Sequence, residues 1–221
     1  MDFVQFVLAP QILNGLTIGV AVVLVALGMT IIFGMLDVIN MAHGEFYAVG
    51  AYLAIVLLSQ GVNFWATLVL VPLCLLPLGY VVEKLLIQRV FHSKDRHILT
   101  LLLTLGISII LQDLLKLIFG PNTMRPSMPI SGGTEFFGVF LPNYRSFLVF
   151  AGSLIIIGSW ILLYRTNFGA MIRAAASDKD MAGSLGVPVY RIYAGTFAFG
   201  VALAGISGVL LAPLYSVFPT M

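Results

Sequence analysis

Long apolar stretches, repeated along the chain, constrain the fold of this protein more than any other feature of its sequence. A helix needs about 20 apolar residues to cross the roughly 30 Å hydrocarbon core of a membrane. Six stretches approach that length and predict membrane spans at residues 8–33, 43–59, 64–82, 98–119, 147–164 and 192–211. Charged residues make up 9% of the chain, against about 25% in soluble domains. The alternating segments of about ten residues that mark a membrane β-barrel are not found. The sequence therefore predicts an all-α, polytopic membrane protein with a single transmembrane domain, residues 1–221.

Basic residues gather in two of the connections between these spans. Four basic residues lie between the third and fourth spans: Lys84, Arg89, Lys94 and Arg96. Four more lie between the fifth and sixth spans: Arg165, Arg173, Lys179 and Arg191. Cytoplasmic connections carry an excess of Lys and Arg. Both connections, including the whole of residues 165–191, are therefore predicted to be cytoplasmic, and both ends of the chain external.

Residues 120–145, "GPNTMRPSMPISGGTEFFGVFLPNYR", form the one sizeable connection predicted on the external side. The stretch is rich in proline and glycine, which is typical of turns and loops. We expect a short hairpin between "EFFGVFLP" and "MPISG". The loop is interpreted either as a landing surface for an extracellular partner or as a structured connector without one.

The stretch "DVINMAHGEFYAVG" places Asp37, His43 and Glu45 close together in an otherwise apolar region. A charge at the bilayer centre costs roughly 2.5 to 3.5 kcal/mol on insertion scales, so such residues usually face water or a partner. One interpretation is a tight cytoplasmic turn, with Asp37 and His43 in water and Glu45 at a helix N-terminus that favours its charge. The other is a broken or re-entrant element near residues 37–48 that lines a translocation path.

Small residues recur at four-residue spacing in two of the predicted spans. Gly15 and Gly19 do so in the first, and Gly200, Ala204 and Gly208 in the last. Such spacing lets helix backbones approach closely in lipid. We expect a packing face on the last span, and on the first either a packing face or the ordinary glycine content of membrane helices.

Residues 165–191 are too polar to span a membrane and combine alanines with Arg173, Asp178 and Asp180 before Gly186 and the helix-breaking Pro188. This composition predicts a short cytoplasmic helix. It is expected to dock onto another protein, or otherwise to lie on the membrane interface.

Sequence motifs for catalysis or metal binding are missing. The chain has no GxxxxGK[ST], HExxH or GxSxG motif and no paired cysteines, and His43, His92 and His97 are not at helical ligand spacing. We therefore predict no enzyme activity, no catalytic residue, no metal site and no cofactor of the chain's own.

Three long segments resemble the permease subunits of branched-chain amino acid ABC importers, the LivH-type family. They are "LNGLTIGVAVVLVALGMTIIFGMLDVINMAHGEFYAVGAYLA", "LLLTLGISIILQDLLKLIFG" and "RTNFGAMIRAAASDKDMAGSLGVPVYRIYAGTFAFGVALAGISGVLLAP". In the first, Asn40 and residues 42–45 stand where the family has its "INxAHGE" core. The resemblance implies that Asn40, His43, Gly44 and Glu45 border the solute path.

In the third segment, Asp180, Met181, Ala182 and Gly186 match the spacing of the motif through which ABC permeases contact their ATPase. Together with Arg173 and Asp178 they are the residues expected to couple the chain to an ATPase. The resemblance further implies ATP use by separate ATPase subunits, a second permease subunit, related or identical, and a periplasmic or extracellular solute-binding protein. It implies a lipid environment in a bacterial inner membrane and no nucleic acid.

The expected function is therefore that of an importer permease for branched-chain or other hydrophobic amino acids. A urea or short-amide permease and an ATP-independent channel or carrier are the alternatives. Family members usually continue past the equivalent of "LLAP", residues 210–213, into further membrane helices. We expect those helices to be missing here.

Overall fold

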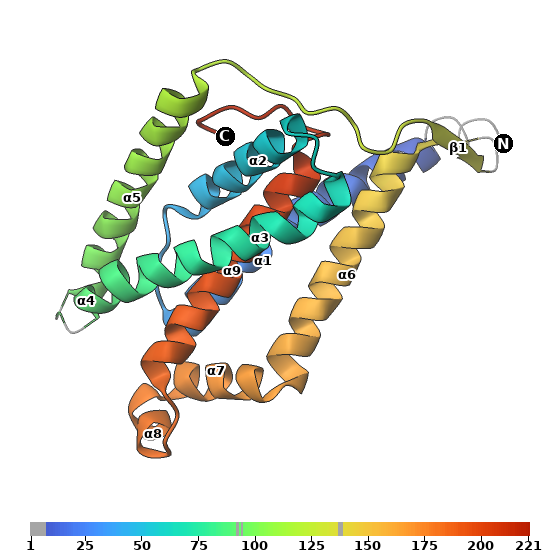
Figure 1. Cartoon of the computed structure of the whole chain (residues 1–221). Helices are drawn as coiled ribbons and strands as arrows, with labels where there is room; N and C mark the ends of the chain where they lie inside the picture. The colour runs from blue at the N-terminus through green and yellow to red at the C-terminus, as the bar shows by residue number, and fades with distance from the viewer. Residues whose placement is uncertain (1–7, 92, 94, 137–138) are drawn as a thin grey trace.

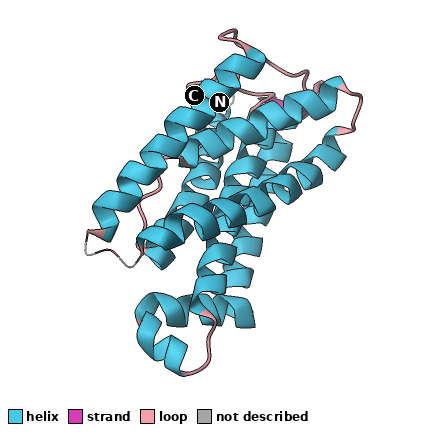
Figure 2. Ribbon diagram, turned by 60° about the vertical axis from the view of Figure 1, so that its left-hand side comes forward, coloured by secondary structure: helices cyan, strands magenta, loops and turns pink. Residues whose placement is uncertain are grey.

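The computed structural model describes residues 8–91, 93, 95–136 and 139–221. They form a bundle of helices with one small hairpin, and the all-α class is confirmed (Figures 1 and 2). Within the described residues, five helices are long and apolar enough to cross a membrane, and a sixth, α2, is shorter. The bounds are α1 Ala9–Leu36, α2 His43–Ser59, α3 Phe64–Val82, the π-helix η2 Glu83–Ile87, α4 Gln88–Val90, α5 Arg96–Phe119, α6 Asn143–Arg165, α7 Asn167–Ser177, α8 Lys179–Ser184 and α9 Val189–Leu211.

Five of the helices run further than the apolar stretches that predicted them. The third continues through η2 and α4, so that Phe64–Val90 is a single membrane-length helix. Helix α6 begins at Asn143, four residues before the expected span, and α1 continues to Leu36. The expected ends were wrong there because polar residues in the terminal turns of a membrane helix reach the interface without ending the helix.

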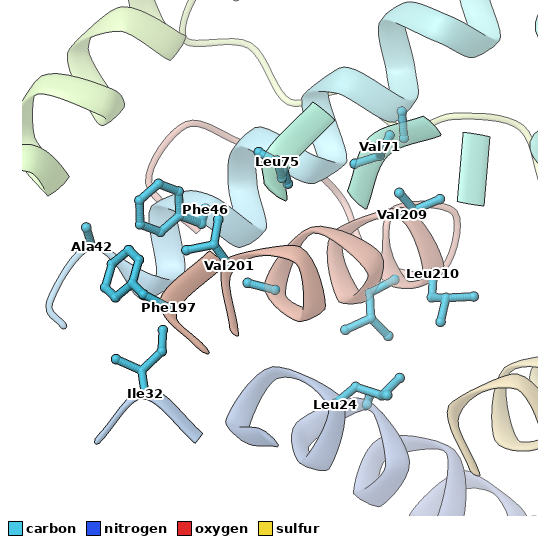
Figure 3. Packing of buried hydrophobic residues seen from close by; sticks show 14 of the residues in the cluster. Leu24, Ile32, Ala42, Phe46, Val71, Leu75, Phe197, Val201, Val209 and Leu210 are labelled. Carbon is cyan, nitrogen blue, oxygen red and sulfur yellow. The ribbon is translucent and has the colours of Figure 1, made fainter. Parts of the chain in front are cut away.

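Helix α9 is the centre of the bundle and is buried on nearly every side. It packs against α1, α2 and α3, as Figure 3 shows. Phe197 of α9 packs edge to face against Phe46 of α2, with 6.3 Å between the ring centroids. Leu75 of α3 packs further along α9 (Figure 3). A helix that is apolar all round belongs in the interior of a bundle.

The two ends of the bundle differ (Figure 1). Helices α7 and α8 and the helix α4 lie at one end. The long connection after α5, the hairpin, the start of α1 and the chain's C-terminus lie at the other. The hairpin pairs β1, Gly133–Phe136, with β2, Val139–Pro142. The expected pairing with "MPISG" is thus wrong, because "EFFGVFLP" contributes to both strands; its residues 137–138 lie outside the described residues.

Candidate functional site

The connection between α1 and α2, residues 37–42, lies deep beside two membrane-length helices although it has no regular helical structure. Its first residue, Asp37, adopts a left-handed conformation with φ 56° and ends α1. At its far end, His43 Nε2 lies 3.0 Å from the carbonyl oxygen of Val25. Val25 precedes the end of α1 by about three helical turns, or about 16 Å. The chain therefore runs back along α1, and α2 begins far inside the bundle.

The backbone of this connection is held by side chains. Thr104 Oγ1, in α5, accepts a hydrogen bond from Met41 N at 3.1 Å and lies 3.1 Å from the carbonyl oxygen of Ile39. Asn40 Oδ1 accepts from Ala42 N at 3.1 Å. Non-helical backbone survives at membrane depth when its polar groups are satisfied in this way. The interpretation as a tight turn in water is right for Asp37, which is exposed and pairs with Arg96 at 2.9 Å, but wrong for His43, which is buried; the broken element is the geometry found.

Three of the four residues expected at the solute path are buried here. Asn40 is 2% exposed, His43 4% and Glu45 7%, while Gly44 is exposed. Glu45 Oε1 accepts a hydrogen bond from Ser108 Oγ of α5 at 3.2 Å. Among the described side chains, Asn40 Nδ2, His43 Nδ1 and Glu45 Oε2 are buried without a partner. Buried polar atoms almost always have one, so this group marks a candidate site.

Sequence reasoning missed Thr104 and Ser108, which complete this cluster, and Tyr52, further along α2. Tyr52 lies two turns beyond Glu45 on α2, and its buried hydroxyl also lacks a partner among the described residues. Thr104 and Ser108 come from α5, about sixty residues away in the chain. The available signal was the four-residue spacing of Thr104 and Ser108, which places two polar side chains on one face of an apolar helix. Beside His43, an apolar groove of about 460 Å³ opens between α1 and α2 and includes Tyr47.

The second candidate region is the helix pair α7 and α8. Asp178 caps α8: its Oδ1 accepts from Asp180 N and Met181 N, each at 2.9 Å. After α8, Gly186 has φ 85°, and Val187 N bonds to Ala182 O at 3.0 Å while Gly186 N bonds to Gly183 O. This is a Schellman motif, which needs a residue such as glycine in the left-handed conformation. The short helix is thus fixed at both ends.

Helix α8 presents apolar side chains outward. Met181 is 62% exposed and Leu185, at its C-cap, 79% exposed, whereas Ala182 is buried against the core. Asp180 is also exposed. Exposed apolar residues on a short polar helix at the end of a bundle are typical of a docking surface.

Arg173 does not belong to that outward surface. Its Nη1 donates to the carbonyl oxygen of Leu163, and its guanidinium lies 5.2 Å from the centre of the Tyr164 ring. Both contacts join α7 to the end of α6. The role of Arg173 in contact with an ATPase stays a prediction, and at least one of its donors is used within the chain.

A partly buried polar link ties the start of α9 to the third membrane helix. Glu83, in η2, is fully buried, and its Oε2 accepts from Gln88 Nε2 at 2.7 Å. The same Nε2 donates to the carbonyl oxygen of Tyr190 at 3.0 Å, at the start of α9. A π-helical turn within an α-helix is often found at functional sites. Glu83 and Gln88 were not singled out from the sequence.

The two small-residue faces differ in the structure. A Cβ at Gly200 would lie 2.9 Å from the carbonyl oxygen of Gly28 in α1, and one at Gly208 2.7 Å from Ala51 N in α2. Ala204, between them, is fully buried. Gly15 and Gly19 have no atom within 4 Å of such a Cβ, so the expected packing face of α1 contacts no other described helix.

Membrane-length helices around a central buried helix, with an unwound polar connection inside the bundle, define a polytopic membrane protein of the transport class. Sequence comparison gives the family. A family model described as "Branched-chain amino acid transport system / permease component" matches residues 11–221, and the chain belongs to this family.

Individual relatives agree with this family. The chain is 29% identical to the high-affinity branched-chain amino acid transport system permease protein LivH of Salmonella typhimurium, over 94% of its own length and 71% of the relative. It is 31% identical to BraD of Pseudomonas aeruginosa over the same shares. It is 25% identical to LivM of Escherichia coli, over 89% of its own length and 51% of the relative. No solved structure is significantly similar to it.

Proposed function

We propose that this chain is a permease subunit of an ATP-driven importer for branched-chain or other hydrophobic amino acids in the inner membrane of a bacterium. Membership of the permease family supports the transport role. The observation that supports coupling to an ATPase is the exposure of the apolar side chains Met181 and Leu185 on α8, a short helix that is capped at both ends. The relatives are branched-chain amino acid permeases, and they lend no support to a urea permease or an ATP-independent carrier.

In this proposal α8 is gripped from the cytoplasm by a separate ATPase. Basic residues support that orientation. Of the described Lys and Arg residues, seven lie toward the α7–α8 end and three toward the other: Lys84, Arg89, Arg96, Arg165, Arg173, Lys179 and Arg191, against Lys116, Arg125 and Arg145. Lys94 and His92 lie outside the described residues. An excess of basic residues marks the cytoplasmic side.

Movement of the ATPase would reach the membrane helices by two routes. Helix α8 packs on α7, and α7 packs on α1, α6 and α9. If α8 and α7 move as one rigid unit, the movement therefore reaches these three membrane helices. The second route is the link from Tyr190 through Gln88 to Glu83 in η2. Small rigid shifts of packed helices of this kind switch many proteins between two states.

The broken element supplies the part that borders the path. Asn40, His43, Gly44 and Glu45 lie at the start of α2 inside the bundle, where unpaired polar atoms can meet a solute or a facing subunit. A second permease subunit, related or identical, completes the path. The matches to both LivH and LivM relatives support a pair of related chains. A solute-binding protein delivers the solute at the opposite end from α8.

The test is solute-dependent ATP hydrolysis. The chain is reconstituted in proteoliposomes with its second permease subunit, ATPase subunits and binding protein, and hydrolysis is measured with leucine or urea. The proposal predicts stimulation by leucine and none by urea. Stimulation by urea instead, or leucine uptake that persists without the ATPase, would contradict it.

A further inference from the structure

A cavity of about 510 Å³ lies at the end of the bundle opposite α7 and α8. It is formed by the start of α1, the start of α6, the connection after α5 and the residues that follow α9. None of the residues assigned above to the path or to coupling lines it. Its volume falls within the range of about 300 to 1,000 Å³ typical of small-molecule sites.

Two arginines line this cavity, and both are held by neutral acceptors. Arg125 donates from Nε to the carbonyl oxygen of Pro213 at 3.2 Å and from Nη2 to that of Leu214 at 3.1 Å. Arg145 donates from Nη1 to Asn14 Oδ1. These contacts fix each guanidinium but leave some of its five N–H donors free.

Neither positive charge is neutralised by a described side chain. Among the described side chains, no carboxylate lies within ion-pair distance of Arg125 or Arg145, while Arg96 at the opposite end is paired with Asp37 at 2.9 Å. An exposed and a half-buried cation that line one cavity, with no counter-charge among the described side chains, form a site for an anion. The planar guanidinium fork matches a carboxylate in particular.

The rest of the lining fits the other part of a small aliphatic molecule. Ile18, Met128 and Leu214 contribute apolar surface, and Asn14 and Thr17 are neutral polar groups. The cavity thus has a positive region beside an apolar one. That combination suits a short aliphatic chain that ends in a carboxylate, and it offers no acidic group to an isolated amine.

We propose that this cavity binds the carboxylate of a small aliphatic solute at the external end of the permease, with Arg125 and Arg145 as its two anion ligands. That the natural solute is an α-amino acid rests on the proposed function. The carboxylate binding itself rests on the two guanidinium groups and the apolar lining.

Binding is tested with the full chain in phosphatidylcholine nanodiscs, without ATPase, ATP or binding protein. The probe is radiolabelled isovalerate, measured by equilibrium dialysis. We expect isovalerate to bind, leucine to displace it and isoamylamine, which lacks a carboxylate, to leave it bound. Because the assay contains no ATPase, a failure of the coupling proposal does not affect its result.

Arg125→Gln and Arg145→Gln should each weaken isovalerate binding about tenfold or more, the usual effect of losing a charge-assisted hydrogen bond. Arg125→Lys and Arg145→Lys keep the positive charge but lose the planar guanidinium fork, so their affinity for isovalerate should lie between those of the unaltered chain and the glutamine variants. Arg165→Gln is the matched control, since Arg165 lies at the opposite end of α6, 5.8 Å from the Trp160 ring centre, and should bind as the unaltered chain does.

Several results would overturn the proposal. They are no isovalerate binding by the unaltered chain, equal displacement by isoamylamine, and equal weakening by Arg165→Gln. Unchanged binding by the lysine and glutamine variants, purified as monodisperse protein, would do the same. Displacement of isovalerate when phosphatidylglycerol is added to the nanodiscs would assign the cavity to lipid headgroups instead.

Discussion

The hydroxyl oxygen of Thr104 lies 3.1 Å from the backbone nitrogen of Met41 and accepts its hydrogen bond, so α5 fixes where α2 begins. Thr104 is fully buried and contacts the unwound backbone of residues 37–42 inside the bundle. A backbone N–H at that depth cannot form a hydrogen bond to water. The backbone of the broken element therefore depends on a side chain from another helix.

Thr104→Val should destabilise the protein by about 1 to 3 kcal/mol, because it keeps the shape of the side chain but leaves Met41 N unpaired. The measurement is the unfolding midpoint of the detergent-purified chain. Thr196→Val is the control: Thr196 is equally buried, but its hydroxyl bonds to Ile192 O within its own helix. An equal loss in both variants would mean that Thr104 has no special role.

The Glu83–Gln88 pair predicts an order of stabilities. Gln88→Leu leaves a fully buried carboxylate without its donor and should cost about 2 kcal/mol or more. Adding Glu83→Leu to it should restore part of the loss, because replacing both partners of a buried pair by apolar groups is often nearly neutral. Unfolding midpoints of the single and double variants give the coupling energy. A double variant that is no more stable than Gln88→Leu would show that the two side chains act independently.

Gly50→Ala should destabilise the contact between α2 and α9. The new Cβ would lie 2.5 Å from Gly205 Cα, so the two backbones must separate, at a cost of about 1 to 3 kcal/mol. Gly15→Ala is the matched change in α1, where a Cβ meets no atom within 4 Å. It should leave the thermal midpoint unchanged or slightly higher, since alanine favours a helix. A lower midpoint for Gly15→Ala than for Gly50→Ala is incompatible with this packing.

Gly186→Ala should loosen the end of α8. Its φ of 85° costs an alanine about 1 to 2 kcal/mol. We expect faster proteolysis between α8 and α9 with no change in the membrane helices, measured by limited digestion and circular dichroism. Gly183→Ala, inside α8 with its nearest neighbour 4.0 Å away, is the control. Equal digestion rates for the two variants would show that Gly186 does not stabilise the C-terminal end of α8.

The helices could be predicted because a bilayer fixes the length of an apolar stretch that crosses it. The ends were less predictable, as in α6, where Asn143 and Arg145 continue the helix beyond its apolar part. The hairpin was predicted with the wrong partner strand, since several turn signals lie close together around residues 120–142.

The candidate sites were predictable where the information is local. Asp178 and Gly186 flank a short helix within ten residues, and both act as its caps. The broken element depends on Thr104, and Arg173 turns to Leu163 because of the angle between α6 and α7. Gly15 and Gly19 have the same spacing as the face of α9 but no facing helix. Such contacts between distant segments cannot be read from spacing alone.

The central claim is that α8 is the cytoplasmic docking point of a separate ATPase. The chain has one cysteine, Cys74, so Cys74→Ser gives a cysteine-free background for site-specific cross-linking. In that background, Leu185→Cys tests α8, and Met128→Cys, which is 46% exposed at the opposite end, is the control.

The most direct measurement is cysteine cross-linking of these two variants to the ATPase subunit in membranes, read as the band of the joined chains. The account predicts a cross-linked product for Leu185→Cys and none for Met128→Cys. The absence of a product at Leu185→Cys, together with its labelling in intact cells by a maleimide that cannot cross the membrane, would contradict the account.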